Sequence, residues 1–335
     1  MTLPEHHRPA VARGLTAAFG ACALESISPL SGGLSGAAVF RIAVDGFAYL
    51  LRIQNGRDAI RDPARGHACM KIAAEAGLAP RVLYACDADG VAITDFIVQR
   101  PPPSDPVAAR AALIPQLGQA VRALHAAPAF PPLIDYLDGV EGLIGQVLAS
   151  DLPSPDTAAR IKALSAKLLA AYRRLAPDLV SSHNDLNPGN IVHDGSRPWL
   201  VDWDAAFLAD RYVDLAALAN VYARAPADEI VLLTAYFAAS PTEAQFARLF
   251  LARQISHLFH AMIFLSGAAA ERPGARLSEP ATGDRSLDQL HAALGAGEPL
   301  LATWEGRVAY GLAHFREAAE AVDGARFDSA VEQAR

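Results

Sequence analysis

The sequence predicts an α+β protein of two lobes, with a strand-rich lobe over residues 1–98 and a mainly helical lobe over residues 99–335. Three observations favour this class. Short apolar runs separated by turn residues occupy the first part of the chain, a proline run follows, and helical patterns fill most of the remainder. With 335 residues, of which 52% are hydrophobic, the chain can bury a substantial core.

The first lobe contains four strand-like runs, VFRIAV, AYLLRIQ, RVLYAC and VAITDFIV. Asp45-Gly46 separates the first two runs and Asp89-Gly90 separates the last two, as expected for hairpins. A helical pattern from about Ala64 to Ala76 lies between the two pairs. It ends at Gly77, a residue typical of helix ends.

The run Arg100–Pro103 is interpreted as a connector, because proline cannot continue a strand ladder. After it, helical patterns cover 106–126, 155–175, 214–223, 227–238, 242–266 and 300–321. A small hairpin is predicted between Asn190 and Asp202, with Gly195 in its turn. The Gly- and Pro-containing stretch over 267–283 is predicted to be a surface loop.

Composition argues against several classes of protein. The 29 basic and 36 acidic residues leave a formal charge of −7, which disfavours a general nucleic-acid-binding protein. Cys22, Cys69 and Cys86 form no CxxC pair, which indicates reduced thiols and a cytoplasmic location. The first residues lack the apolar core of a signal peptide.

The most apolar later run, Leu249–Ser266, is interrupted by Arg253 and two histidines. A charged residue at the centre of a membrane span is costly, so this run is expected to be a buried helix. We therefore expect no membrane partner.

The strongest functional pattern is HNDLNPGN over 183–190, followed by VDWD over 201–204. Phosphoryl transfer needs an oriented nucleophile and metal ions that hold the phosphates. A carboxylate such as that of Asp185 can orient a hydroxyl and take its proton. The amide oxygen of Asn190 and the carboxylate of Asp202 are hard oxygen ligands of the kind Mg²⁺ prefers. The alternative interpretation is a polar loop with capping and turn residues.

These motifs resemble the catalytic loop and the metal-binding aspartate of the aminoglycoside phosphotransferase and choline/ethanolamine kinase superfamily, distant relatives of protein kinases. The resemblance implies a bilobal protein-kinase-like fold that uses ATP and Mg²⁺. It also implies catalytic roles for Asp185, as the base, and for His183, as a support of the loop. Asn190 and Asp202 would be the metal ligands.

The resemblance extends to positions that bind the nucleotide. SGGLSG over 31–36 lies where these kinases place the loop that covers the phosphates, which implies contacts from Gly32, Gly33 and Ser35. A glycine-rich hairpin turn is the alternative. ITDFI over 93–97 resembles the hinge strand, in which backbone groups of Thr94 and Phe96 bond the adenine edge; otherwise it is a buried strand.

Arg52, in LLRI, resembles the phosphate-binding residue of the third strand, where choline- and thiamine-kinase-like members use Arg. Its guanidinium can form two parallel hydrogen bonds to phosphate oxygens. The alternative is an exposed strand residue without a ligand. One departure is that the helix that normally supplies a Glu partner has no acid near its middle. His67 is a candidate replacement, and Glu75 lies close to the helix end.

Two further aspartates have open roles. Asp204 follows Asp202 by two residues, which places both side chains on one face of an extended chain, so it can assist the metal or the acceptor. Asp214 is a good N-cap for its helix, and the family has an aspartate here that braces the catalytic loop. His125 is expected to be structural.

The leading prediction is ATP- and Mg²⁺-dependent phosphorylation of a small-molecule hydroxyl acceptor. Arg52 and the DWD pattern favour a choline-, ethanolamine- or thiamine-like acceptor over an aminoglycoside-type antibiotic. The alternative from another class is an inactive nucleotide-binding pseudokinase, supported by the missing helix Glu. A metal-dependent hydrolase is disfavoured, because no second His/Asp set has ligand spacing. The sequence does not indicate an oligomeric state.

Overall fold

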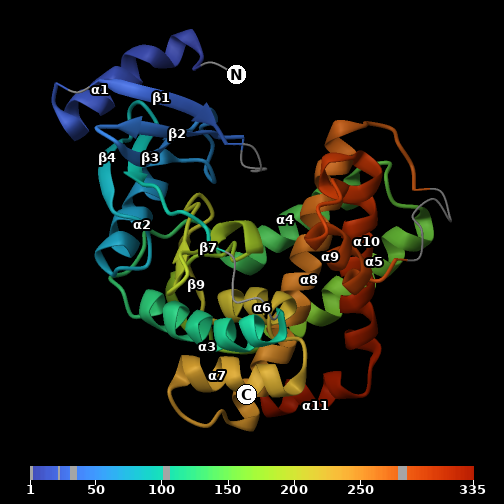
Figure 1. Cartoon of the computed structure of the whole chain (residues 1–335). Coiled ribbons are helices and arrows are strands. Elements are labelled where there is room, and N and C mark those ends of the chain that lie inside the picture. The colour runs from blue at the N-terminus through green and yellow to red at the C-terminus, as the bar shows by residue number, and fades with distance from the viewer. Residues whose placement is uncertain (1–2, 22, 31–35, 101–105, 278–284) are drawn as a thin grey trace. The chain divides into compact units, whose positions relative to one another are not determined.

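The computed structural model describes residues 3–21, 23–30, 36–100, 106–277 and 285–335. The chain forms two compact units, each made of two chain segments. The first unit comprises Met1–Leu133 and Asp178–Ser240, and the second comprises Ile134–Pro177 and Pro241–Arg335. Figure 1 shows the elements of both units, and their mixture of an N-terminal sheet with many helices confirms the predicted α+β class.

The first unit contains an antiparallel five-stranded sheet in the order β1-β2-β3-β5-β4. Its strands are β1 (Leu24–Pro29), β2 (Ala38–Val44), β3 (Phe47–Ile53), β4 (Val82–Cys86) and β5 (Val91–Asp95). Asp45 and Gly46 have φ of 50° and 78°, the left-handed conformations that a tight two-residue hairpin turn requires. The four predicted strand runs are confirmed, and β1 adds an edge strand.

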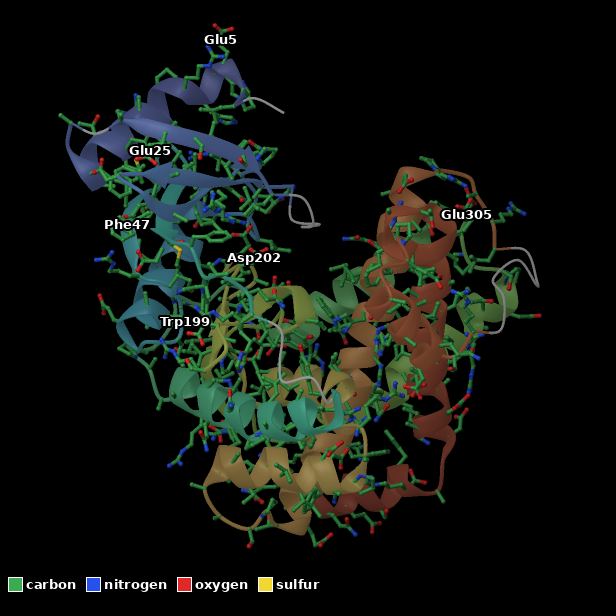
Figure 2. The ribbon with its side chains drawn as sticks, viewed as in Figure 1. Glu5, Glu25, Phe47, Trp199, Asp202 and Glu305 are labelled. Atoms are coloured by element: carbon green, nitrogen blue, oxygen red, sulfur yellow. The ribbon has the colours of Figure 1, made fainter. Side chains whose placement is uncertain are left out.

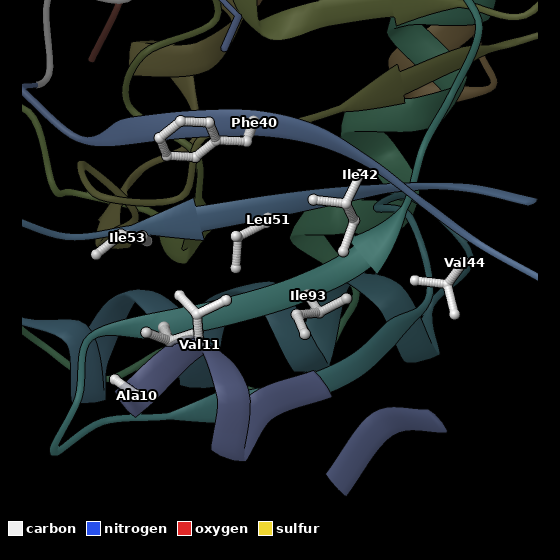
Figure 3. Packing of buried hydrophobic residues seen from close by; sticks show 9 residues of the cluster. Ala10, Val11, Phe40, Ile42, Val44, Leu51, Ile53 and Ile93 are labelled. Carbon is white, nitrogen blue, oxygen red and sulfur yellow. The ribbon is translucent and has the colours of Figure 1, made fainter. Parts of the chain in front are cut away.

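One face of this sheet is covered by helix α1 (Arg8–Phe19), which follows the short helix η1 (Glu5–His7). Val11 packs in a cluster with Leu51, Ile53 and Ile93 (Figure 3). The sequence analysis missed α1, of whose 12 residues only Ala10, Val11 and Gly14 are buried. Since side chains alternate along a strand, Arg52 lies on the face opposite Leu51 and Ile53.

Helix α2 (Pro63–Glu75) agrees with its predicted range to within one residue. The Asp62 side chain accepts a hydrogen bond from the Ala64 N–H, an N-cap that stabilises the helix start. Gly77, with φ of 73°, follows the helix end in the left-handed conformation expected there. Cys69 and Ala73 on this helix are completely buried.

In its described residues, the rest of the first unit consists of two small sheets, the short helix η2 (Pro188–Asn190) and three α-helices. The predicted hairpin is present as β7 (Ile191–His193) and β8 (Pro198–Leu200), and the helices are α3 (Pro106–His125), α6 (Tyr212–Val221) and α7 (Pro226–Phe237). The sequence analysis missed the pair of β6 (Leu179–Ser182) and β9 (Phe207–Asp210), because four-residue strands give little periodicity. Ser182 pairs with Phe207, so residues 183–206 are closed at their base by this sheet.

The second unit is helical and is organised around α8 (Glu243–Glu271), which contacts α4 (Tyr136–Ala149), α5 (Pro155–Tyr172), α10 (Trp304–Asp323) and α11 (Arg326–Gln333). The unit also contains α9 (Leu287–Gly295) and the short helix η3 (Leu300–Ala302). The sequence analysis missed α4, α9 and α11. The loop predicted over 267–283 is wrong for its first residues, because α8 continues to Glu271 through three alanines, of which Ala268 is fully buried.

Within the described ranges, α8 is the one helix that is long and apolar enough to cross a membrane. Most of its apolar window is buried inside the structure, as in the core helix of a globular domain. Cys69 and Cys86 are free thiols, and Cys22 lies outside the described residues.

Candidate active site

The loop that carries HNDLNPGN, between β6 and β7, is anchored to the core by Asp214 in α6. The Asp214 carboxylate accepts 2.8 Å hydrogen bonds from the main-chain N–H groups of His183 and Asn184. Asn184 has a φ of 62°, and its side-chain amide donates to the Ala205 carbonyl at 3.0 Å. The start of the HNDLNPGN loop is therefore fixed by a buried acid and by the segment that precedes β9.

Asp214 is completely buried, and a chain of polar side chains leads away from it. His125 Nε2 lies 3.1 Å from Asp214 Oδ2, and His125 Nδ1 lies 2.7 Å from the Tyr236 hydroxyl, which also accepts from Arg211 at 3.0 Å. Burial pushes the pKa of Asp214 upward. The hydrogen bond and charge of His125, together with His183, outweigh this effect and hold the pKa below its usual range.

His183 links the HNDLNPGN loop to the segment before Asp202. Its ring is completely buried, Nε2 lies 3.0 Å from the Val201 carbonyl oxygen, and the ring packs on Trp203 at 4.6 Å. These contacts are with the protein interior. Its membership of the catalytic set stays a prediction.

The carboxylate of Asp185 is held by two asparagine side chains. Asn187 Nδ2 donates to Oδ1 at 3.0 Å, and Asn190 Nδ2 donates to Oδ2 at 2.9 Å. Each carboxylate oxygen retains a further acceptor site for a substrate hydroxyl. The sequence analysis did not assign Asn187, although its place two residues after Asp185, before Pro-Gly, is a signal for such a local side-chain bond.

The hairpin β7–β8 brings the two predicted metal ligands together. Ile191 pairs with Leu200, and the Val201 N–H donates to the Asn190 carbonyl oxygen at 3.0 Å, so Asp202 lies next to the strand position opposite Asn190. Figure 2 labels Asp202 just beyond this hairpin and Trp199 within it. Asp202 has a φ of 65°, a conformation that few residues other than glycine adopt and that often marks a functional site.

The side-chain oxygens of Asn190 and Asp202 are suited to bind a magnesium ion. A carboxylate and an amide oxygen are hard ligands, and Mg²⁺ is usually bound by one or two carboxylates together with substrate phosphates and water. In the described part of the chain, no cluster of three or more His, Cys, Asp or Glu side chains forms a self-sufficient metal site. A metal at this place would therefore depend on Asp202, Asn190 and the nucleotide.

Arg52 reaches the same segment from β3. Its Nη2 lies 2.6 Å from Asp204 Oδ2 and 3.3 Å from Asp202 Oδ1. His67 does not pair with Arg52, because its Nδ1 bonds Asp87 at 2.7 Å. Burial lowers the pKa of His67, and the Asp87 carboxylate offsets this effect only in part.

Of the residues predicted to contact the nucleotide, some lie in the described part of the chain and others do not. Gly32, Gly33 and Ser35 lie outside the described residues. The Leu30 N–H donates to the Val39 carbonyl at 2.8 Å, so the flanks of this segment form a hairpin. Thr94 is buried in β5, and Phe96 follows the strand directly. The nucleotide roles of all five residues stay predictions.

Comparison with known proteins gives a consistent result. The sequence model described as "Phosphotransferase enzyme family" matches residues 26–250, which is more than half of the chain. No curated protein matches the chain.

Solved structures resemble the chain over nearly its full length. A choline/ethanolamine kinase family protein from Mesorhizobium loti has a TM-score of 0.71 at 20% identity, with 98% of each chain covered. The choline kinase LicA from Streptococcus pneumoniae has a TM-score of 0.65 at 12% identity, covering 95% of this chain and 99% of its own. A spectinomycin phosphotransferase bound to ADP and spectinomycin has a TM-score of 0.54 at 13% identity, covering 92% and 98%. These likenesses confirm the predicted protein-kinase-like fold.

Proposed function

The chain belongs to the phosphotransferase enzyme family, and from this premise we propose that it transfers the γ-phosphoryl group of ATP to a hydroxyl group of a small molecule. The observation that supports this most directly is the convergence of Asp185, Asn190 and Asp202. The carboxylate of Asp185 is bonded to the Asn190 side chain, and the main chain of Asn190 is bonded to the residue before Asp202.

In the proposed reaction Asp185 accepts a hydrogen bond from the acceptor hydroxyl, turns its oxygen toward the γ-phosphorus and takes up the proton. Asn187 and Asn190 fix the carboxylate, so its orientation does not have to be selected at each turnover. Magnesium, when bound with ATP, neutralises charge on the phosphates. Asn190 and Asp202 would hold it, and Arg52 would bind phosphate oxygens.

We propose an amino-alcohol of the choline or ethanolamine type as the first acceptor to test, with thiamine as the second. Two of the structural likenesses are to proteins named choline/ethanolamine kinase family protein and choline kinase. An aminoglycoside-type acceptor is the alternative, since the spectinomycin phosphotransferase also shares the fold.

An inactive pseudokinase is the alternative from another class. Its support was the missing helix Glu beside Arg52, and in the structure two other carboxylates contact Arg52. We also propose a cytoplasmic location, which agrees with the use of ATP and with the free thiols of Cys69 and Cys86.

The decisive experiment is a screen for acceptor-dependent release of ADP from ATP, with amino-alcohols, thiamine, sugars and aminoglycosides, with and without Mg²⁺. Once an acceptor is found, Asp185→Asn should lower kcat by roughly 10²–10⁴-fold, because it removes the base but keeps the size of the side chain. The affinity for Mg-ATP should change little, since Asp202 is intact.

Asp45→Asn is the matched control, because Asp45 lies in the exposed β2–β3 turn, where asparagine is equally suited. Parental turnover in Asp185→Asn would remove Asp185 as the base. A chain that binds Mg-ATP but releases no ADP with any acceptor would favour the pseudokinase.

A further inference from the structure

Arg52 contacts two carboxylates, and the contacts are unequal. The Nη2 atom lies 2.6 Å from Asp204 Oδ2, the distance of a strong charge-assisted hydrogen bond, but 3.3 Å from Asp202 Oδ1, which is a weaker contact. The side chains of Arg52 and Asp204 are 17% and 18% exposed. A pair so far removed from water is screened less than a surface ion pair.

Helix α2 leaves room for the Asp204 side chain. In its first turn α2 carries Gly66, and a Cβ atom built on Gly66 would lie 3.5 Å from Asp204 Oδ1. The Asp204 carboxylate thus lies against the helix surface at a place that has no side chain. A larger residue at position 66 would compete for the space beside this carboxylate.

The neighbouring residue Arg65 fastens the segment that carries Asp204. Arg65 is 5% exposed, and its guanidinium donates to the carbonyl oxygens of Asp204 at 2.7 Å and Ala206 at 2.5 Å. Helix α2 therefore supplies a buried cation that holds the main chain of the segment, and the segment supplies the acid. Arg52, Asp204 and Arg65 form one connected unit.

We propose that Asp204 is the positioning residue of Arg52 and takes the place of the absent helix acid. The proposal rests on the proposed phosphotransferase function. When Mg-ATP binds, Asp202 is needed by the metal and Arg52 by the phosphates, so their 3.3 Å contact opens. The 2.6 Å contact with Asp204 persists and keeps the guanidinium pointed at the phosphates.

This arrangement couples the grip on the phosphates to the metal site. Asp202 and Asp204 are separated by one residue, and both belong to the segment that Arg65 holds. Displacement of the segment would move a metal ligand and the partner of Arg52 together. Asp204 has two competing roles, as a direct ligand of the metal or as a contact of the acceptor. Each role predicts a different result in the experiment below.

The test is a double-mutant cycle on Mg-ATP affinity, measured by calorimetry on the full chain without acceptor. Asp204→Asn should weaken Mg-ATP binding on the order of tenfold, the effect of losing one charge-assisted hydrogen bond. Arg52→Ala should weaken it at least as much. The double variant should match Arg52→Ala alone, because Asp204 then has no guanidinium to position.

Two variants serve as matched controls. Asp87→Asn removes a carboxylate that bonds His67, with no contact to Arg52, and should leave Mg-ATP affinity unchanged. Gly66→Ala places a methyl group at ordinary contact distance from Asp204 and should also be tolerated.

The contrary outcomes are distinct. Equal weakening by Asp204→Asn in the presence and absence of Arg52, with a higher Mg²⁺ requirement, would make Asp204 a metal ligand and overturn the inference. Unchanged nucleotide affinity with a raised KM for the acceptor would make it an acceptor contact and also overturn it. If the parental chain binds no Mg-ATP at all, the proposed function itself fails.

Discussion

At the scale of single residues, Asp202 shows how the local backbone is shaped for a role. Its left-handed conformation costs a residue other than glycine on the order of 1–3 kcal/mol. The surrounding structure imposes it, because Val201 is held by Asn190 through its N–H and by His183 through its carbonyl oxygen. Strain of this kind persists where the orientation of the side chain matters.

Asp202→Asn should therefore weaken the affinity for ATP in the presence of Mg²⁺ by about tenfold or more, while the protein stays folded. Asparagine tolerates the left-handed backbone, whereas alanine would add strain to the loss of the ligand. Calorimetry with ATP in the presence and absence of Mg²⁺ measures the effect. If the ratio of the two affinities is the same as in the parental chain, Asp202 is not a metal ligand.

Cys69 gives a second residue-scale prediction. Burial raises the pKa of its thiol to about 12, so it is almost entirely protonated at pH 8 and inaccessible as well. Iodoacetamide at pH 8 should leave Cys69 unmodified in the native protein and modify it in 8 M urea, as peptide mass spectrometry would show. Native modification of Cys69 at the rate of the more exposed Cys86 would contradict this placement.

At the scale of secondary-structure elements, the proposed catalytic loop over 183–190 is held by elements that lie far from it in the chain. Strands β6 and β9 close its base, and α6 presents Asp214 to its first two N–H groups. Helix α3 contributes His125 to the same carboxylate. Two strands and two helices thus fix the loop before a ligand is bound.

Asp214→Asn should lower the free energy of unfolding by about 3 kcal/mol, because an amide cannot accept all three hydrogen bonds and turns an N–H toward a donor. Urea denaturation measures this loss. Asp138→Asn is the control, since Asp138 pairs with Arg173 at the surface, where an ion pair contributes about 0–1 kcal/mol. Equal losses in the two variants would show that Asp214 is not the anchor of the loop.

At the scale of the whole molecule, the compact units do not follow the order of the chain, because each unit is made of two separate chain segments. The proposed catalytic segment over 183–204 belongs to the same compact unit as the N-terminal sheet, although it follows more than forty residues that fold with the second unit. The predicted division into a nucleotide lobe over 1–98 and an acceptor lobe over 99–335 concerns function, and it stays a prediction.

The pH dependence of global stability also belongs at this scale. The pKa of His67 is lowered in the folded chain, so the unfolded chain binds more protons in the range just below pH 6.5. The stability that neutral His67 contributes is present above pH 6.5 and is lost as pH falls through its folded pKa. The free energy of unfolding should decrease between pH 7 and pH 5.

His67→Gln should flatten this decrease, and His6→Gln, which changes an exposed histidine, should leave the slope as it was. Urea titrations at several pH values provide the comparison. A slope of equal size in the parental chain and in His67→Gln would show that another group causes the acid destabilisation.

The sequence by itself determined the features that arise from short-range patterns. Alternating apolar runs and the Asp45-Gly46 turn predicted β2 to β5, and the two short apolar runs on either side of Gly195 predicted the β7–β8 hairpin, because neighbouring residues alone create these patterns. The family resemblance rested on the same local motifs. Very short elements, such as the four-residue strand β6, lacked a periodic signal that local reasoning could detect.

Only the tertiary structure decided which charged groups meet. The partner of Arg52 is 152 positions away in the chain, and the fixing of Asp214 by His125 spans 89 positions. No local pattern records such pairs, because they depend on how the sheet, α2 and the catalytic segment pack together. The sequence therefore showed that the usual helix acid is missing, and only the fold showed that Asp204 lies beside Arg52, since burial and distance determine which carboxylate a guanidinium can reach.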